Sequence, residues 1–281
     1  MVTTQRALVL GGGGITGIAW EWGMLTGLAE AGVDLTGADL VIGTSAGSVV
    51  GAQVAAGIEP AVRYQAQLEP PDGELAATLG RGLMLRFALA LLGPPSGERF
   101  RARVGRIALR ARTEATEADR IAVIESRLPV RDWPERRLLI TAVDAVTGRF
   151  RAFDRHDGVP LVHAVAASCA VPGVWPPVTI DGRRYIDGGV RSGSNADLAA
   201  GADRVVVLAP LPRGIGPMTP VGKQVEALRE RSEVVLVSPD RAALEAFGRN
   251  VLDPAARASA ARAGYAQAKS EVERVKAVWA A

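Results

Sequence analysis

The stretch LVIGTSAGS, residues 40–48, decides the fold of this chain. An apolar run, Leu40–Ile42, leads into the G-x-S-x-G pattern of Gly43 to Gly47, and the Ala- and Val-rich run Ala46–Ala56 follows. A strand, a tight turn of small residues and a helix are the context of a nucleophile elbow, which presents its serine at the helix N-terminus. The plainer alternative is a strand-to-helix turn with an N-capping serine. The flanking elements favour Ser45 as a nucleophile.

Four further runs read as buried strands, because they are short, β-branched or Leu-rich and bounded by turn residues. These runs are Ala7–Leu10, Leu138–Val143, Arg204–Leu208 and Val234–Val237. Helical apolar spacing over Ile18–Glu30 separates the first run from Leu40–Ile42. This alternation predicts an α/β domain with a mostly parallel sheet and helices on both faces.

We expect the whole chain, residues 1–281, to form a single domain. The stretch from about 59 to 130 holds prolines, an apolar run at Leu83–Leu92 and an Arg-rich segment, but no clear strand. It predicts a helical cap or insertion over the sheet edge. The final stretch, Ala255–Ala281, predicts a surface helix that closes the domain.

Composition excludes several classes of function. A net charge of +3 is too small to indicate nucleic-acid binding, and the Arg-rich segment lacks interleaved aromatic residues. The single cysteine, Cys169, allows neither a disulfide nor a cysteine-based metal site, and two histidines limit any other metal site. The most apolar stretch, Leu83–Gly93, is too short to span a bilayer, and we do not expect the first residues to act as a secretory signal. We therefore expect a cytoplasmic protein without metal or cofactor.

A glycine-rich loop, LGGGGITG at residues 10–17, follows the first predicted strand. Gly12, Gly14 and Gly17 spell G-x-G-x-x-G, the fingerprint of dinucleotide-binding folds, and Asp34 stands about twenty residues further on. An NAD(P)-dependent oxidoreductase is therefore one alternative. Against it, Asp34 follows AEAG rather than a β-branched strand, and the next strand ends in GTSAG.

A serine nucleophile needs a base, and the two histidines stand in poor places for that role. His156 lies in a polar turn-like stretch and His163 in an expected helix, so both are read as structural or solvated. The acid that stands out is Asp187, in RRYIDGGVRSG, followed by Gly188 and Gly189. Taken alone, this D-G-G would be an ordinary hairpin turn.

Together, the glycine loop, G-x-S-x-G and D-G-G resemble the patatin-like phospholipase family, whose members hydrolyse acyl esters of lipids with a Ser–Asp dyad. The block AASCAVPGVWPPV, residues 166–178, is similar to the segment that precedes the family's catalytic Asp. The resemblance covers roughly Ala7 to Leu208. It implies a three-layer α/β sandwich and a phospholipase A or lysophospholipase activity that needs no cofactor.

The resemblance also implies roles for individual residues. Ser45 would be the nucleophile and Asp187 the base, and the reaction would pass through an acyl-enzyme. The oxyanion hole would come from the loop backbone and the residue after the nucleophile: Gly12, Gly13, Gly14 and Ala46. Supporting glycines of the three motifs would be Gly17, Gly43, Gly47, Gly188 and Gly189. The remaining alternative is a relative that binds lipid but has lost catalysis.

Two positions depart from the family pattern. Many relatives carry a basic residue where this chain has Thr16, and a His where it has Trp20. The missing basic side chain removes one partner for a phosphate near the loop but leaves the backbone amides intact. The loss of this basic side chain therefore affects an expected preference for phospholipids more than it affects acyl hydrolysis itself.

Two stretches of the cap bear on lipid handling. In the segment Arg99–Arg112, an apolar helical face (Phe100, Val104, Ile107 and Ala111) adjoins an arginine face. Such a helix is able to lie on an anionic membrane surface, but a surface helix with a solvated arginine face is the favoured interpretation. The run Leu83–Leu92 is the best sequence candidate for an acyl-chain groove, with ordinary core as the alternative.

Overall fold

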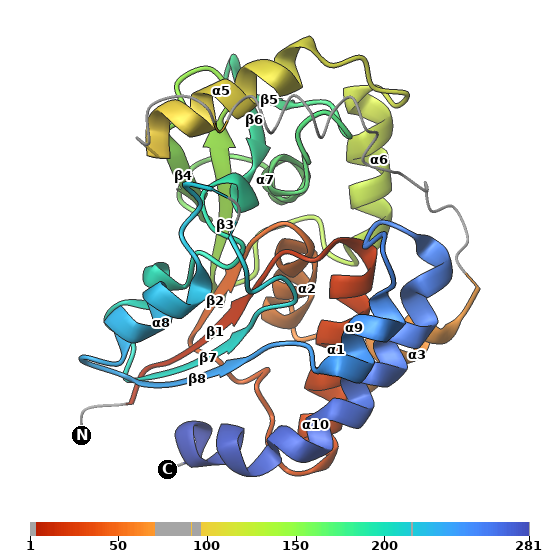
Figure 1. The fold of residues 1–281 in the computed structure, drawn as a ribbon, viewed down its shortest axis with the longest axis vertical. Coiled ribbons are helices and arrows are strands. Elements are labelled where there is room, and N and C mark those ends of the chain that lie inside the picture. The colour runs from red at the N-terminus through yellow and green to blue at the C-terminus, as the bar shows by residue number, and fades with distance from the viewer. Residues whose placement is uncertain (1–3, 71–90, 92–96, 215, 281) are drawn as a thin grey trace.

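A computed structural model describes residues 4–70, 91, 97–214 and 216–280 of the chain. A central sheet of strand order β5-β6-β3-β2-β1-β7-β8, with β4 paired to β3, runs through the molecule (Figure 1). Its parallel strands are β1 (Arg6–Leu10), β2 (Leu40–Gly43), β3 (Arg137–Asp144), β7 (Arg204–Leu208) and β8 (Glu233–Val237). The mostly parallel sheet predicted from sequence is confirmed, and these five strands agree with the expected runs to within one residue at each end.

Three strands at one side of the sheet are antiparallel and were not predicted. They are β4 (Phe150–Phe153), β5 (Val178–Ile180) and β6 (Arg183–Asp187). Both β4 and β6 pair with β3, and β5 pairs with β6. Asp187, the last residue of β6, therefore lies opposite Ala142 in the middle of the sheet rather than in an isolated hairpin turn.

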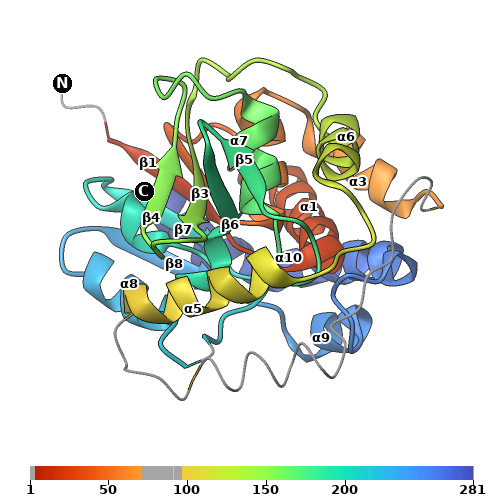
Figure 2. The same cartoon turned by 90° about the horizontal axis from the view of Figure 1, so that it is seen from above.

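Helices cover both faces of the sheet, as predicted (Figures 1 and 2). Alternate residues of each central strand point to opposite faces, so that Leu8 and Leu10 join one core cluster while Ala7 and Val9 join another. The first cluster packs against α1 (Gly14–Glu30), α2 (Ala46–Ala55), α7 (Leu161–Ser168), α9 (Arg241–Phe247) and α10 (Arg257–Trp279). The second packs against α8 (Val221–Leu228) and the 3₁₀ turn η2 (Ala196–Ala199). Further 3₁₀ turns are η1 (Gly188–Val190) and η3 (Pro254–Ala256).

Helices α1 and α10 pack closely because both carry glycine at the contact. A Cβ at Gly264 of α10 would lie 2.3 Å from the carbonyl oxygen of Trp20, and one at Gly23 of α1 would lie 2.2 Å from that of Ala261. At the same interface the Trp20 indole donates to Gln267 Oε1 at 3.0 Å. The long C-terminal helix thus fixes α1, and with it the glycine loop from which α1 starts.

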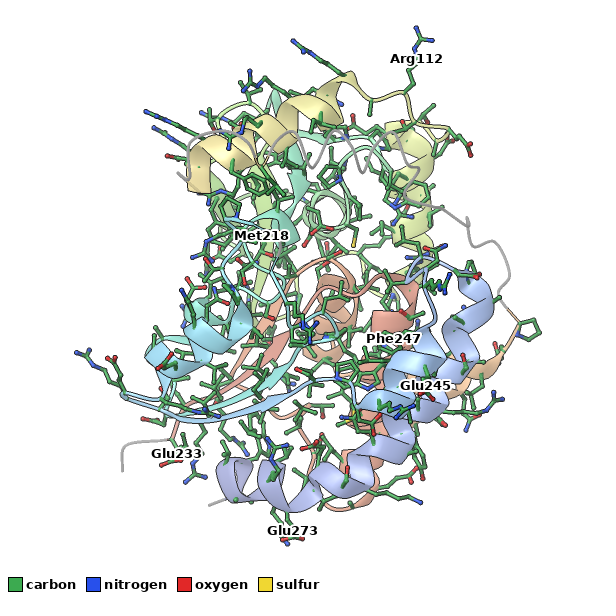
Figure 3. All side chains as sticks on the ribbon, in the orientation of Figure 1. Arg112, Met218, Glu233, Glu245, Phe247 and Glu273 are labelled. Atoms are coloured by element: carbon green, nitrogen blue, oxygen red, sulfur yellow. The ribbon has the colours of Figure 1, made fainter. Side chains whose placement is uncertain are left out.

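In the described part of the region expected as a cap, three helices are present: α3 (Pro60–Leu68), α5 (Gly97–Arg110) and α6 (Glu117–Arg127). Phe100, Val104 and Ala108 of α5 are buried against β3 and β6, which agrees with the favoured interpretation of this segment. Arg112 follows α5 and projects away from the molecule (Figure 3). Most of the apolar run Leu83–Leu92 lies outside the described residues. None of the described helices has the length and apolarity to cross a bilayer.

Glu21 of α1 carries a carboxyl group that is fully buried in the core. Burial raises the pKa of this group well above its ordinary value, and the Gly11 N–H offsets the shift only in part. A carboxyl whose folded pKa exceeds its unfolded pKa stabilises the fold fully at low pH. That contribution is lost as the pH rises through the folded value, by at most about 1.4 kcal/mol per pH unit.

We therefore predict that Glu21→Gln changes how stability depends on pH. In thermal unfolding between pH 5 and pH 8, the wild-type midpoint should fall relative to that of Glu21→Gln, because glutamine does not ionise. Glu226→Gln on the exposed side of α8 is the matched control and should follow the wild type. Parallel curves for wild type and Glu21→Gln would contradict the buried-carboxyl argument.

Candidate active site

The glycine loop and the G-x-S-x-G turn lie side by side at one edge of the sheet, because they follow the parallel neighbours β1 and β2. Ser45 stands between β2 and α2 with φ 53° and ψ −119°, a strained conformation for a residue with a side chain. Such strain is typical of a nucleophile elbow. The residue is 9% exposed and lines a small pocket.

Neither Gly43 nor Gly47 of the turn has room for a side chain. A Cβ at Gly47 would lie 2.1 Å from the carbonyl oxygen of Leu10, and one at Gly43 would lie 2.5 Å from Ser48 Cα. Gly47 therefore allows the start of α2 to approach the end of β1, and Gly43 allows the turn to close against the start of α2. Across the loop, a Cβ at Gly12 would lie 3.3 Å from Ser45 Cβ, so the glycine loop runs directly beside the serine.

Asp187 meets Ser45 from the opposite direction, at the end of β6. The Ser45 hydroxyl lies close enough to the Asp187 carboxylate to lower its pKa, and the Gly189 N–H donates to Asp187 Oδ1 at 2.7 Å. Burial raises the pKa of Asp187 to about 6, against the opposing effects of these two groups and of the Arg120 charge. The carboxyl is therefore mostly ionised at neutral pH and yet a stronger base than an ordinary aspartate.

The D-G-G pattern has a packing reason as well. A Cβ at Gly188 would lie 2.3 Å from Thr141 Oγ1, so the chain can turn against β3 after Asp187 only with glycine there. Sequence alone suggested a hairpin turn as the alternative. The structure instead places Gly188 at the start of η1, which follows β6 directly.

The loop amides differ in their availability. Gly12, predicted as an oxyanion donor, gives its N–H to the carbonyl oxygen of Gly193 at 2.7 Å, so this donor is already in use. Gly14 has φ 61° and begins α1, and Ala46 begins α2. The first N–H groups of a helix have no partner within the helix, and Gly14 and Ala46 both line the pocket with Ser45.

A buried polar network ties these pieces together, and sequence reasoning did not find it. The side-chain amide of Asn195 donates to Thr44 Oγ1 and the Ser192 carbonyl at 3.0 Å, and to Thr141 Oγ1 and the Gly188 carbonyl at 3.3 Å. Thr44 precedes the serine, and Gly188 follows the aspartate. One amide thus joins both halves of the site. The only hint in the sequence is an Asn shortly after D-G-G.

We predict that Asn195→Gly destabilises the fold by about 1–3 kcal/mol, because it leaves buried hydrogen-bond partners unmatched. Glycine is chosen because Asn195 has φ 51°, where alanine would add backbone strain. Urea unfolding measures the change. Asn250→Gly, at a less buried position, is the comparison variant. An unfolding midpoint like the wild type's for Asn195→Gly would show that the network does not stabilise this region.

The block AASCAVPG contributes directly to the elbow. Ser168 Oγ, at the end of α7, accepts a hydrogen bond from the Ser45 N–H at 2.9 Å. The thiol of Cys169 donates to the Ser45 carbonyl at 3.2 Å, and burial raises the pKa of this thiol. Asp187 N–H donates to the Ala170 carbonyl at 3.1 Å, so one short segment holds both candidate catalytic residues.

The pocket around Ser45, here called the serine pocket, is walled by cap residues that the sequence did not single out. Arg120 and Arg127 of α6 line it together with Trp175 and Leu252. The Arg120 guanidinium lies over the Trp175 ring, 4.2 Å from its centroid. These arginines follow the segment that the sequence analysis marked as basic. Arg120 and Arg127 reach the serine pocket because α6 packs beside it, and this packing is not visible in the sequence.

The other candidates from the sequence lie elsewhere. Asp34 precedes β2, at the opposite end of the sheet from the glycine loop, and its carboxylate accepts from the Thr36 N–H and hydroxyl. It therefore cannot meet a ligand on that loop as the dinucleotide fingerprint requires. Neither His156 nor His163 is among the described residues that line the serine pocket. Nor do the described residues contain a cluster of three or more His, Cys, Asp or Glu side chains suited to a metal.

Thr16 and Trp20, the two departures from the resemblance, are both fully buried in α1. The Thr16 hydroxyl bonds to the Gly13 carbonyl at 3.3 Å, and Trp20 packs edge-on against Phe247 with ring centroids 6.5 Å apart. Figure 3 labels Phe247 on α9, beside this packing. Both departures thus face the α9–α10 side of α1.

Comparison with known proteins gives a match over residues 8–200 to the family described as Patatin-like phospholipase. Relatives described as uncharacterized NTE family proteins occur in Mycobacterium bovis and Mycobacterium tuberculosis. Each is 30% identical over 200 residues, which covers 68% of this chain and 47% of the relative. The chain therefore spans about half the length of these relatives.

Solved structures with a similar fold include VipD from Legionella pneumophila, at 13% identity and a TM-score of 0.48. That match covers 97% of this chain and 67% of VipD. A second is full-length ExoU from the type III secretion system of Pseudomonas aeruginosa, solved with SpcU, at 20% identity and a TM-score of 0.43. It covers 99% of this chain and 53% of the other.

Proposed function

Because this chain belongs to the patatin-like phospholipase family, we propose that it is a serine hydrolase of lipid acyl esters. The observation that carries the proposal is the approach of the Ser45 side chain, on a strained turn at a helix N-terminus, to the buried Asp187 carboxylate, whose pKa it lowers. The proposed activity is of the phospholipase A or lysophospholipase type.

In the first half of the proposed reaction, Ser45 Oγ attacks the ester carbonyl and forms a C–O bond, while its proton passes to Asp187. The tetrahedral intermediate then collapses, the bond to the leaving alkoxide breaks, and Asp187 returns the proton to it. The products are a free alcohol and an acyl-enzyme on Ser45. In the second half, water attacks the acyl group, Asp187 takes the water proton, and the fatty acid leaves as Ser45 regains its hydrogen.

The negative charge on the intermediate needs donors. We propose Gly13, Gly14 and Ala46, since the Gly12 N–H is held by Gly193. The positive ends of α1 and α2 both point toward this space, which adds a favourable electrostatic contribution. Each well-placed donor is worth roughly 3–4 kcal/mol of transition-state stabilisation. Gly12 then serves the site by allowing the loop to pass close to the serine.

We also propose that any contact with an anionic membrane is electrostatic and peripheral. Arg106 and Arg110 are exposed on the outer side of α5, whereas the apolar side of that helix is packed against the sheet. Arginine side chains near an anionic surface supply about 1 kcal/mol of attraction each. The described part of α5 therefore offers charge, but no free apolar face to insert.

A fluorophosphonate probe tests the proposed nucleophile, because an activated serine displaces fluoride and becomes covalently phosphonylated. We expect intact-mass labelling of the wild type at a single site, with the labelled peptide containing Ser45, and no labelling of Ser45→Ala. Tight NAD binding without serine labelling would instead favour the oxidoreductase alternative. Labelling without hydrolysis of any short-chain p-nitrophenyl ester would favour a relative that retains the site but not the turnover.

A further inference from the structure

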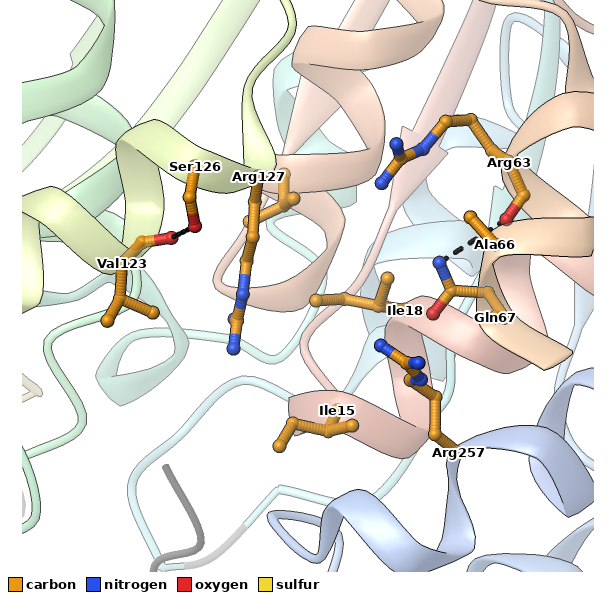
Figure 4. Close-up of a pocket in the computed structure, with 10 residues that line it drawn as sticks. Ile15, Ile18, Arg63, Ala66, Gln67, Val123, Ser126, Arg127 and Arg257 are labelled. Atoms are coloured by element: carbon orange, nitrogen blue, oxygen red, sulfur yellow. Dashed lines mark hydrogen bonds between the residues drawn. The ribbon is translucent and has the colours of Figure 1, made fainter. Parts of the chain in front are cut away.

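A second pocket adjoins the serine pocket, and its walls carry three arginines from three different elements. Arg63 comes from α3, Arg127 from the end of α6 and Arg257 from the start of α10. Figure 4 shows their guanidinium groups pointing toward the same space, around Ile18 of α1. We call this space the arginine pocket. None of the described residues that line it is acidic.

The arginine pocket has room for a ligand group. Its volume is about 180 Å³, well above the roughly 10–15 Å³ that a single water molecule requires. It is also continuous with the serine pocket, because Ile15, Ile18 and Arg127 line both. A molecule whose ester carbonyl lies over Ser45 can therefore extend past the two isoleucines to reach the arginines.

Arg63 is partly buried in the arginine pocket beside a like charge. Burial and the like charge of Arg257 both lower the pKa of Arg63. The Nε atom of Arg63 is buried, and no described residue accepts a hydrogen bond from it. Arg257 is held in place by bonds from its Nη2 atom to the carbonyl oxygens of Glu69 at 2.7 Å and Pro70 at 3.1 Å. A bound anion would relieve this repulsion and accept from the buried donor.

We infer that the arginine pocket binds the phosphate group of an acyl-ester substrate whose scissile carbonyl lies over Ser45. This inference rests on the proposed function and narrows it to esters that carry a phosphate, such as a monoacylglycerol phosphate. Guanidinium groups bind phosphate through paired hydrogen bonds, which suits a site built from several arginines. The basic charge missing at Thr16 would thus be supplied from other elements.

Binding to Ser45→Ala tests the inference, because the substrate then stays intact whether or not the wild type hydrolyses it. Three probes are titrated calorimetrically: monooctanoylglycerol 3-phosphate, monooctanoylglycerol and inorganic phosphate. We expect the phosphorylated lipid to bind most tightly. Adding Arg63→Gln should weaken its binding about ten- to a hundredfold and leave the binding of monooctanoylglycerol unchanged. Arg63→Lys should restore part of the loss, because it keeps the charge.

Arg231→Gln is the matched control, since Arg231 is exposed and lies in the turn before β8. It should bind all three probes as the Ser45→Ala parent does. Thermal unfolding of each variant shows whether it is folded. Equal affinity of the parent for the phosphorylated and neutral lipids would overturn the inference, as would an unchanged affinity in Arg63→Gln. Inorganic phosphate binding as tightly as the phosphorylated lipid would show a site for the free ion and overturn the substrate assignment.

The proposed function and the inference fail in different ways. Loss of the inference leaves ester hydrolysis by the wild type intact, with no preference for phosphate. Loss of the proposed function leaves no hydrolysis, while Arg63-dependent binding of the phosphorylated lipid to Ser45→Ala would still support the phosphate site.

Discussion

Ser45→Ala should lower kcat for acyl-ester hydrolysis by about 10⁴-fold or more while leaving substrate binding almost unchanged. The reason is that Ser45 supplies the attacking oxygen and nothing in the described part of the serine pocket replaces it. Asp187, the helix ends and the pocket walls remain in place, so a residual rate from positioning and oxyanion stabilisation alone is expected. The measurement is kcat and KM with monooctanoylglycerol 3-phosphate and with a p-nitrophenyl ester.

Removal of the serine side chain should not unfold the protein, and a control variant checks this. Ser270→Ala on the exposed side of α10 removes the same atom far from the pocket and should keep wild-type kinetics. Serine and alanine both carry a Cβ atom, so the φ of 53° at position 45 is equally strained for either residue. The substitution therefore adds no backbone strain. A kcat within tenfold of the wild type for Ser45→Ala would place the nucleophile elsewhere and overturn the proposed mechanism.

The central strands were predictable because each is buried on both faces, which produces continuous apolar runs such as ALVL and RVVVL. The antiparallel strands were not, because they are short and β5 and β6 carry exposed residues. In RRYID, Arg183 is exposed, and the strand is defined by its pairing with β3 rather than by its own pattern. The local pattern thus predicted only that Asp187 ends an element, and it was the family resemblance that paired Asp187 with Ser45.

The details of the site depend on contacts between distant parts of the chain. The fingerprint at Gly12 and Gly14 predicts free amides, yet the carbonyl of Gly193 takes the Gly12 N–H. At Gly105 of α5, the general rule is that glycine weakens a helix. In the structure a Cβ there would lie 1.9 Å from the carbonyl oxygen of Ala145, so glycine allows α5 to reach the β3–β4 turn. Neither contact leaves a trace in the local sequence.

The arginines illustrate the same limit. The spacing of Arg99 to Arg110 drew attention to α5, whose apolar side turns out to pack on the sheet. The arginines that line the two pockets come from α3, α6 and α10, which are far apart in sequence. A pocket wall is a property of tertiary packing, and isolated arginines in three helices give no periodic signal. A pocket of this kind can be found only once the helices are placed.

Asp187→Asn should lower kcat/KM by about 10²- to 10⁴-fold, the usual contribution of a general base, and should also remove a limb of the pH profile. Because the pKa of Asp187 is about 6, wild-type kcat/KM should reach half its maximum near pH 6 and fall tenfold per unit below that. Only the ionised carboxylate accepts the Ser45 proton. Asparagine has no such ionisation, so its residual activity should be flat across this range.

The control for this profile is Asp34→Asn, at the exposed turn where the dinucleotide alternative would place its ribose ligand. It should keep both the rate and the wild-type limb near pH 6. A limb that persists in Asp187→Asn would assign the base to another group.

The burial that raises the pKa of Asp187 also lowers the stability of the fold at neutral pH. Because the folded pKa exceeds the unfolded value, stability that is present at low pH is lost as the pH rises through about 6. Thermal unfolding should therefore show Asp187→Asn gaining on the wild type between about pH 4 and pH 6, with no further gain above that range. The group that sets the reaction rate thus also lowers the stability of the fold.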